Sequence, residues 1–275
     1  MGTGMASSVY SAGAMPSTAA ITAEADGGYT VAVAASDIGT GARTALALVA
    51  AEALGVHPSV VSVKIADSDL GPAWFAGGST GTASWSWAVM RAAADLRARL
   101  AETGGVGLVE GITGSADTTA QLAALPARER QAHGAQFVEV AVDPLTGEVR
   151  VRRMLGMFAA GRIVNPLTAR SQLVGGMVMG LSMALHEEGL RDSTFGGLAN
   201  GDFARYHIAT HADVPEVEAD WVDDREPSHP SGVKGLGEVS TVGTAAAIAN
   251  AVWHATGVRH RDLPITPGRV LSHRG

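Results

Sequence analysis

The stretch Pro230-Ser-Gly-Val-Lys-Gly-Leu-Gly-Glu238-Val-Ser-Thr-Val-Gly-Thr244 runs directly into the apolar segment Ala245–Trp253, which predicts a loop entering a helix. The loop places a single carboxylate, Glu238, close to Lys234 and among glycines. Glycine lets a backbone approach a ligand closely, and the first turn of a helix leaves N–H groups that suit phosphates and oxyanions. We therefore interpret Glu238 as a candidate base that faces a bound anionic cofactor.

The composition is that of a compact globular protein or of a piece of a larger assembly. The 275 residues are 46% apolar and 17% charged, with a net charge of −7, which argues against disorder. Lys and Arg form no basic stripe, so we expect no nucleic-acid partner. We find no apolar run of membrane-spanning length and no signal-peptide pattern in the first ten residues. We therefore expect a cytoplasmic protein, or a periplasmic one if a partner subunit carries it across the membrane.

The chain contains no cysteine. It therefore cannot supply a disulfide, a thiolate zinc site, an iron–sulfur cluster or a cysteine nucleophile. His186, Glu187 and Glu188 are consecutive and so do not share a helix face, which favours a solvated helix end over a metal site. Any metal must be held by His or carboxylates, or by a cofactor that carries its own ligands, and the spacing of the residues predicts no metal ligand.

Strands, glycine loops and helices alternate in a way that favours a mixed α+β fold over a regular βαβ sheet. No Pro/Ser linker divides the chain, so we treat 1–275 as one domain, with possible sub-domains of about 1–130 and 131–275. The N-terminus predicts a strand that has already begun, which suggests a truncated or split polypeptide. We expect strands around the turn 25–28, the second being Thr30–Ser36, then Val60–Ala66, a hairpin of Ala135–Val142 and Glu148–Met157, and Glu216–Val222; helices up to about Leu54, over Thr82–Leu100, Leu167–Glu188 and Glu238–Thr256; a variable connection over 103–128; and an extended tail over Asp262–Pro267.

Two further glycine loops precede helices. The loop Asp37-Ile-Gly-Thr-Gly-Ala-Arg-Thr44 could cradle a phosphate or a pterin with its backbone N–H groups, but ordinary strand-to-helix turns have the same pattern. It matches neither the P-loop nor the dinucleotide-binding fingerprint. The loop Gly77-Gly-Ser-Thr-Gly-Thr82 carries hydroxyls that could donate to an anion or cap the helix.

Two amide side chains lie near the start of the helix that follows Pro166. Asn165 and Gln172 could recognise the edge of a nucleobase. Asn165 also suits a helix cap with Pro166 at the first helical position, and it can cap and bind at once. Trp85 and Trp87 are interpreted as packing anchors.

Several motifs occur here in the order found in one family, and the match extends from the first residues to about Val270. The chain resembles the C-terminal molybdopterin-binding part of the large subunit of the xanthine dehydrogenase/aldehyde oxidase family, and it is most similar to bacterial aldehyde oxidoreductases of three-subunit type. The motifs are Asp37-Ile-Gly-Thr-Gly, Asp67-Ser-Asp-Leu, Gly77-Gly-Ser, Val142-Asp-Pro-Leu-Thr-Gly-Glu-Val149, Gly161-Arg-Ile-Val-Asn-Pro, Gln172-Leu-Val-Gly-Gly176, Lys234-Gly-Leu-Gly-Glu238 and Ala247-Ile-Ala-Asn-Ala-Val252.

The resemblance implies a role for each matching position. Glu238 matches the catalytic base, which deprotonates a hydroxyl on molybdenum whose oxygen attacks the substrate carbon while hydride passes to a sulfido ligand. In this family the pterin's own sulfurs hold the metal, so no protein ligand is expected. The implied cofactor contacts are Gly39, Thr40 and Gly41 in one loop, Gly78, Ser79 and Thr80 in another, Lys234 and Gly237 beside the base, and Asn165 and Gln172 near the nucleotide end of a molybdopterin cytosine dinucleotide.

The resemblance further implies a molybdenum-dependent oxidoreductase that acts on aldehydes or N-heteroaromatics. Its expected partners are the N-terminal half of the molybdenum subunit, an iron–sulfur subunit with a 2Fe-2S centre and an FAD subunit. This chain alone is expected to be inactive, because half of the cradle lies elsewhere. The alternative is a non-catalytic fragment that binds a nucleotide or a partner, and a third possibility is that the isolated segment self-associates.

Overall fold

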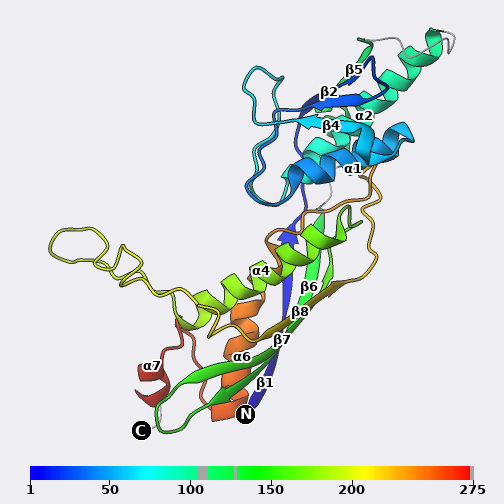
Figure 1. The fold of residues 1–275 in the computed structure, drawn as a ribbon. Helices are drawn as coiled ribbons and strands as arrows, with labels where there is room; N and C mark the ends of the chain where they lie inside the picture. Colours follow the sequence, from blue (N-terminus) through cyan, green and yellow to red (C-terminus); the bar gives the residue numbers. More distant parts are fainter. Residues whose placement is uncertain (104–110, 127–128, 273–275) are drawn as a thin grey trace.

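Two four-stranded sheets, each with helices packed on it, make up the protein (Figure 1). The computed structural model describes residues 1–103, 111–126 and 129–272. The expected α+β fold with mixed sheets is confirmed. One sheet has the order β1-β6-β7-β8 and the other β4-β3-β2-β5. The strands are β1 Gly2–Ser11, β2 Thr18–Ala23, β3 Tyr29–Ala32, β4 Val61–Lys64, β5 Thr113–Asp117, β6 Gln131–Val142, β7 Val149–Ala159 and β8 Glu216–Trp221.

The first sheet joins the N-terminal strand to three strands from the second half of the chain. Strand β1 pairs antiparallel with β6, and β8 pairs parallel with β7. Helix α6 (Thr244–Thr256) packs on β1 and β6, and α4 (Pro166–Leu185) packs on β8 and on α6. Gly2 and Gly4 allow this approach, since a Cβ at either position would lie within 2.3 Å of an α6 carbonyl oxygen. Alternation along β1 therefore turns one face, which includes Ser8 and Tyr10, toward the helices.

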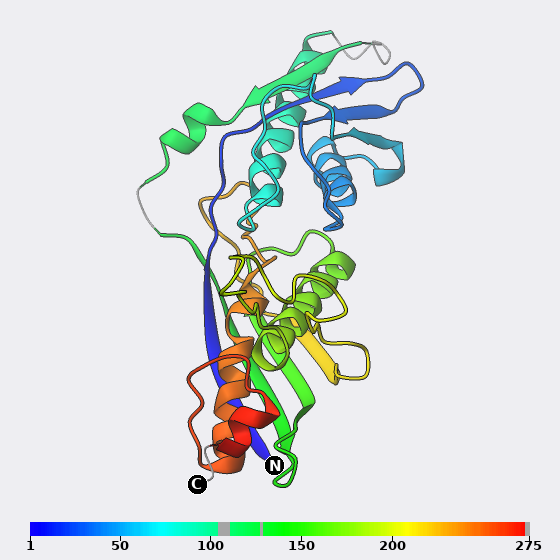
Figure 2. The same cartoon turned by 90° about the vertical axis from the view of Figure 1, so that its left-hand side faces the viewer.

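The second sheet is covered by α1 (Ala42–Leu54) and α2 (Gly81–Glu102), which also pack on each other. Leu46, Trp85 and Leu96 are buried between these helices and the sheet, and Trp87 is buried as well. The two tryptophans are thus packing anchors, as predicted. Full burial of such side chains contributes about 1.5–3 kcal/mol each. The helices begin at the end of this unit that faces α4 and the segment before α5 (Val239–Val242) (Figure 2).

Most expected elements are present, with informative exceptions. The helix predicted over 238–256 is broken into α5 and α6 at Gly243, where a Cβ would lie 2.2 Å from the amide oxygen of Gln136. Gln136 is fully buried and donates from Nε2 to the carbonyls of Val239 and Ser240, both at 3.3 Å, which a continuous helix would use internally.

Two regions predicted to lack regular structure contain it. The expected connection over 103–128 holds β5 and the short helix α3 (Thr119–Ala123), while its parts 104–110 and 127–128 lie outside the described residues. The extended tail is followed by α7 (Pro267–Ser272), whose first residue is the proline. No described helix is long and apolar enough to cross a membrane. The proposed sub-domain boundary near residue 130 stays a prediction.

Candidate functional site

A cavity of about 290 Å³ lies where loops from both halves of the molecule meet. Eight of the predicted site residues line it, and three do not: Gly39, Gly41 and Thr80. A larger hollow of about 590 Å³, near the turn between β6 and β7, contains none of the predicted residues. The smaller cavity is therefore the candidate site. The predicted residues that line it are Thr40, Gly78, Ser79, Asn165, Gln172, Lys234, Gly237 and Glu238.

The candidate base is bound to the loop before α2. Ser79 Oγ donates to Glu238 Oε2, and the Glu238 amide N–H donates back to Ser79 Oγ at 3.0 Å. The two loops are pressed together, since a Cβ on Gly235 would lie 2.2 Å from the Ser79 carbonyl oxygen. A glycine at 235 is thus required by contact, and Glu238 sits where the second half of the chain touches the first.

A third group at the carboxylate, Tyr10, was not predicted. Partial burial, the negative charge of Glu238 and a hydrogen bond to that carboxylate raise the pKa of Tyr10. Tyr10 therefore keeps its proton and acts as the donor. Period-two alternation in β1 places it on the helix-facing side, but nothing in the sequence relates it to Glu238, which comes from the far end of the chain.

The loop before α2 leaves helix N–H groups open to the cavity. Thr80 Oγ1 donates to the Gly77 carbonyl at 2.7 Å, so it does not cap the helix. Within the part of the chain that the structure describes, the amides of Gly81 and Thr82 have no acceptor, and both residues line the cavity. The N-terminus of a 22-residue helix is thereby presented to a ligand, which favours a negatively charged group.

The loop before α1 is closed on itself. Asp37 accepts from the amides of Gly39 and Gly41 at 3.0 and 3.1 Å, and from that of Arg43 at 3.2 Å. Burial opposes the ionised form, but these backbone hydrogen bonds outweigh it and lower the pKa of Asp37. The N–H groups that could have cradled a phosphate therefore already have an anionic partner. Cofactor contact by Gly39 and Gly41 stays a prediction.

Helix α4 forms another wall. Asn165 Oδ1 accepts from the Leu167 amide at 3.1 Å and Pro166 is at the first helical position, so the predicted cap is confirmed. Its Nδ2 remains available to a ligand. Gln172 faces the same cavity, and a Cβ on Gly237 would lie 3.8 Å from its Oε1. Arg162, which was not predicted, also lines the cavity and pairs with Glu52 of α1.

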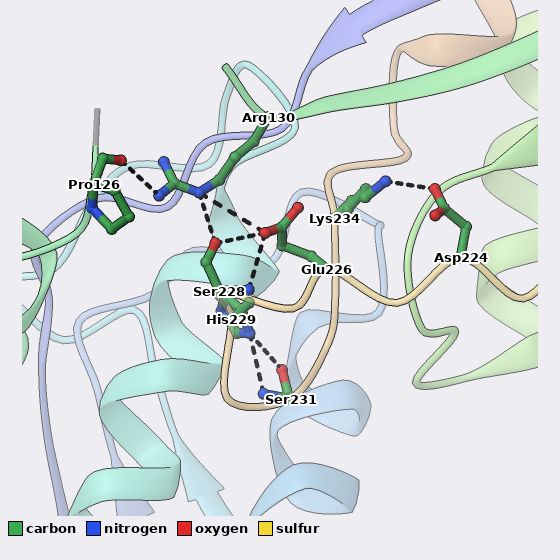
Figure 3. Close-up of polar contacts among 8 residues, drawn as sticks. All are labelled: Pro126, Arg130, Asp224, Glu226, Ser228, His229, Ser231 and Lys234. Atoms are coloured by element: carbon green, nitrogen blue, oxygen red, sulfur yellow. Dashed lines mark hydrogen bonds and ion pairs between the residues drawn. The ribbon is translucent and has the colours of Figure 1, made fainter. Parts of the chain in front are cut away.

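The segment that leads to Glu238 is anchored by a polar network (Figure 3). Lys234 lines the cavity but its Nζ pairs with Asp224, which neutralises its charge. His229 Nε2 donates to the Ala83 carbonyl of α2 at 2.7 Å, while its Nδ1 accepts from the Ser231 amide at 3.2 Å. Burial lowers the pKa of His229, so the neutral ring is the form that fits.

The far end of this network is Arg130, at the start of β6. Its Nε donates to Ser228 Oγ at 2.8 Å and lies 4.0 Å from the carboxylate of the buried Glu226. The network therefore fixes residues 224–234 against both halves of the molecule (Figure 3).

The described residues contain no group of three or more His, Cys, Asp or Glu side chains that could hold a metal ion. His186, Glu187 and Glu188, which follow the C-terminal end of α4, lie half-buried, and the two glutamates accept from Tyr206 and Arg269.

Comparison with known proteins identifies the family of this chain. A profile of the molybdopterin cofactor-binding domain matches residues 1–113 and 112–215. The chain belongs to this family. It is 41% identical over 272 residues to the aldehyde oxidoreductase molybdenum-binding subunit PaoC of Escherichia coli K12, a match that covers 90% of this chain and 37% of that protein. The gamma subunit of the 6-hydroxypseudooxynicotine dehydrogenase complex of Paenarthrobacter nicotinovorans is 30% identical over 288 residues, covering 90% and 36%.

Solved structures have the same fold. The aldehyde oxidoreductase of Desulfovibrio desulfuricans superposes with a TM-score of 0.84 at 26% identity, over 98% of this chain and 32% of that one. A Cu,Mo carbon monoxide dehydrogenase superposes with a TM-score of 0.86 at 21% identity, which shows the fold alone. The family is thus that of the molybdenum-binding subunits of xanthine dehydrogenase/aldehyde oxidoreductase type, and the chain spans little more than a third of the curated relatives quoted above.

Proposed function

We propose that this chain forms one wall of the molybdenum-cofactor site of a hydroxylase that oxidises aldehydes or N-heteroaromatics with oxygen from water. The observation that carries the proposal is the position of Glu238, whose carboxylate stands in the same cavity as the open N–H groups of α2. The names of PaoC and of the nicotine-derivative dehydrogenase subunit support both substrate classes.

The cavity suits an anionic cofactor that brings its own metal ligands. Gly78, Gly235 and Gly237 give it walls without side chains, and the α2 N-terminus offers donors to a phosphate or pterin. When bound, molybdopterin would supply the metal and the two-electron redox chemistry. Gln172 and the Nδ2 of Asn165 are the groups that would meet its nucleotide end, in the cytosine dinucleotide form that we propose.

Glu238 would act as a general base. A base must lie within hydrogen-bond reach of the proton it takes, and Glu238 lines the cavity that the cofactor would fill. Its amide and Oε2 are bound by Ser79, and its carboxylate interacts with the Tyr10 phenol, whose pKa it raises. The side chain is therefore held in place before any substrate arrives, which lowers the entropic cost of proton transfer.

We further propose that activity requires the rest of the molybdenum subunit, an iron–sulfur subunit and an FAD subunit. The support is coverage, since the match spans 37% of PaoC, the molybdenum-binding subunit of an aldehyde oxidoreductase. Purified by itself, the chain should contain little molybdenum and should not oxidise aldehydes. Stoichiometric molybdenum and turnover in the isolated chain would contradict this part of the proposal.

The central test is Glu238→Gln in the assembled enzyme. Removing the base while keeping the side-chain volume should lower kcat on the order of 10²- to 10⁴-fold. Molybdenum content, measured by mass spectrometry, should stay unchanged. Glu148→Gln is the matched control, because Glu148 is half-exposed, pairs with Arg150 and lies at the turn between β6 and β7. Turnover of the Glu238→Gln enzyme near that of the control would instead favour a module that only binds a nucleotide or a partner.

A further inference from the structure

Ser79 has a backbone conformation that residues other than glycine rarely adopt. Its φ is +56°, and Ala66, at +61°, is the only other residue besides glycine with positive φ among those described. Glycine adopts this region without a steric penalty, whereas a side chain crowds the following carbonyl. Gly77 and Gly78 precede it in the same loop. A serine that stays in a strained position within a glycine loop points to a use for its hydroxyl.

Both hydrogen bonds of the Ser79 hydroxyl are made to the candidate base, Glu238. Ser79 Oγ gives its one hydrogen to Glu238 Oε2, and one of its lone pairs accepts the Glu238 amide N–H at 3.0 Å. A hydroxyl has no second hydrogen, so Ser79 Oγ cannot at the same time donate to a phosphate or a pterin. The hydrogen of the Ser79 hydroxyl is therefore committed to Glu238, although Ser79 lines the candidate cavity.

Glu238 needs contacts from other parts of the fold, because the helix that follows it is short. Glu238 precedes α5, which has only four residues and is too short to fix a side chain by helix packing alone. Gln136 Nε2 donates hydrogen bonds to the carbonyls of Val239 and Ser240. Ser79 holds the amide and one carboxylate oxygen of Glu238 from the side, and Tyr10 reaches the same carboxylate from β1.

We propose that Ser79 is a positioning residue for Glu238, which orients the carboxylate by binding its Oε2 and the amide of the same residue. This inference rests on the proposed role of Glu238 as the base. In this role Ser79 acts through Glu238 and not on the substrate, so its loss should lower the rate of the chemical step and leave binding of substrate and cofactor intact.

The test uses two variants in the assembled enzyme with its partner subunits. Ser79→Gly removes the hydroxyl and relieves the backbone strain, and Ser79→Ala removes the hydroxyl and keeps the strain. Both should lower kcat on the order of 10- to 100-fold, since misplacement of a catalytic group by about 1 Å costs that much. KM for an aldehyde such as benzaldehyde should change by less than about twofold, and molybdenum content should not change.

Ala66→Gly is the matched control. It relieves the same kind of strain at an exposed residue that contacts neither Glu238 nor the cavity, so kcat should stay as in the parent enzyme. If Ser79 only shaped its loop, Ser79→Gly would behave like this control. Because glycine suits the conformation, Ser79→Gly remains informative even if Ser79→Ala fails to fold.

A second background separates this inference from the proposed function. Glu238→Asp withdraws the carboxylate by one methylene from Ser79 Oγ and leaves the contact to the amide, so adding Ser79→Gly to it should lower kcat by a smaller factor than in the parent enzyme. If Glu238→Gln is inactive and Ser79→Gly has parental kcat, or loses molybdenum, the positioning role is wrong and the proposed function stands. If Glu238→Gln keeps its turnover, the proposed function itself fails.

Discussion

Two glycine loops of similar sequence precede α1 and α2, and their amides have different partners. In the loop over 37–41, the carboxylate of Asp37 accepts the backbone N–H groups of Gly39, Gly41 and Arg43. The loop over 77–81 contains no acid, and the amides of Gly81 and Thr82 have no acceptor within the described residues. Glycines before a helix therefore permit an anion site, but an acidic residue inside the loop fills it.

The two loops also differ in the residues that they contact. Gly41 lies against Thr168 of α4, where a Cβ would come within 2.7 Å, so the first loop acts as a spacer between the halves. The second loop contacts Gly235 and Glu238, so it carries the candidate chemistry. Both loops line the cavity, through Thr40 in the first and Ser79 in the second, but it is the second that contacts the candidate base.

The largest expected effect comes from making the second loop resemble the first. Thr82→Asp places a carboxylate in the first turn of α2, at a residue that lines the cavity. The carboxylate should accept hydrogen bonds from the open amides, as Asp37 does in the first loop. It should also repel an anionic cofactor. Molybdenum content of the assembled enzyme should fall about tenfold or more. Thr44→Asp, in the first turn of α1, is the control, and it should leave molybdenum content unchanged.

The next effect concerns His229, which anchors the segment before Glu238 to the first turn of α2. His229 must stay neutral, because Nδ1 accepts the Ser231 amide while Nε2 donates to Ala83. Burial lowers its pKa in the folded state, and the charge of Arg130 adds to this, while the Ala83 carbonyl and Glu226 oppose it. The unfolded chain therefore binds the proton more readily. The stability that His229 contributes is complete above its unfolded pKa of about 6.5 and is lost as the pH falls below it.

His229→Gln keeps a donor for Ala83 and cannot be protonated. The variant should be less stable than the parent by about 2 kcal/mol at pH 7.5, because a buried, hydrogen-bonded ring is lost. That deficit should shrink as the pH is lowered toward 5, at no more than about 1.4 kcal/mol per pH unit. Urea unfolding of both proteins across this range measures the difference. A deficit that is constant with pH would contradict the neutral-ring assignment.

Much of the site could be predicted locally, because its parts are encoded by neighbouring residues. The cap formed by Asn165 and Pro166, the left-handed Gly55 after α1 and the loop that carries Glu238 each follow from a few adjacent positions. Local reasoning treated the loops over 37–41 and 77–81 alike. The sequence could not show that the Asp37 carboxylate accepts from the amides of its own loop, since an aspartate that points into solvent would have the same sequence.

The parts that were missed depend on contacts between distant segments. Tyr10 meets Glu238 only because β1 pairs with β6 beneath α5 and α6. The break at Gly243 depends on Gln136, a buried residue of another strand. The strained backbone of Ser79 can be related to a role only once its hydrogen-bond partner, Glu238, is known. Such features require the register of the sheet, which no periodicity within a single segment specifies.

The smallest expected effect tests the closed loop itself. Asp37→Ala leaves three amides without their acceptor, and because the loop is exposed, water can replace it in part. We therefore expect a loss of only about 1 kcal/mol of stability at pH 7, and molybdenum content close to that of the parent. The acid range provides the sharper measurement. The pKa of Asp37 is lowered in the folded state, so its contribution is present above the unfolded pKa of about 3.9 and is lost as the pH falls through the lower, folded value. Urea unfolding should therefore show the parent and the variant converging below pH 4. If Asp37→Ala instead removes molybdenum as Thr82→Asp does, the first loop is part of the cofactor site and the contrast between the two loops fails.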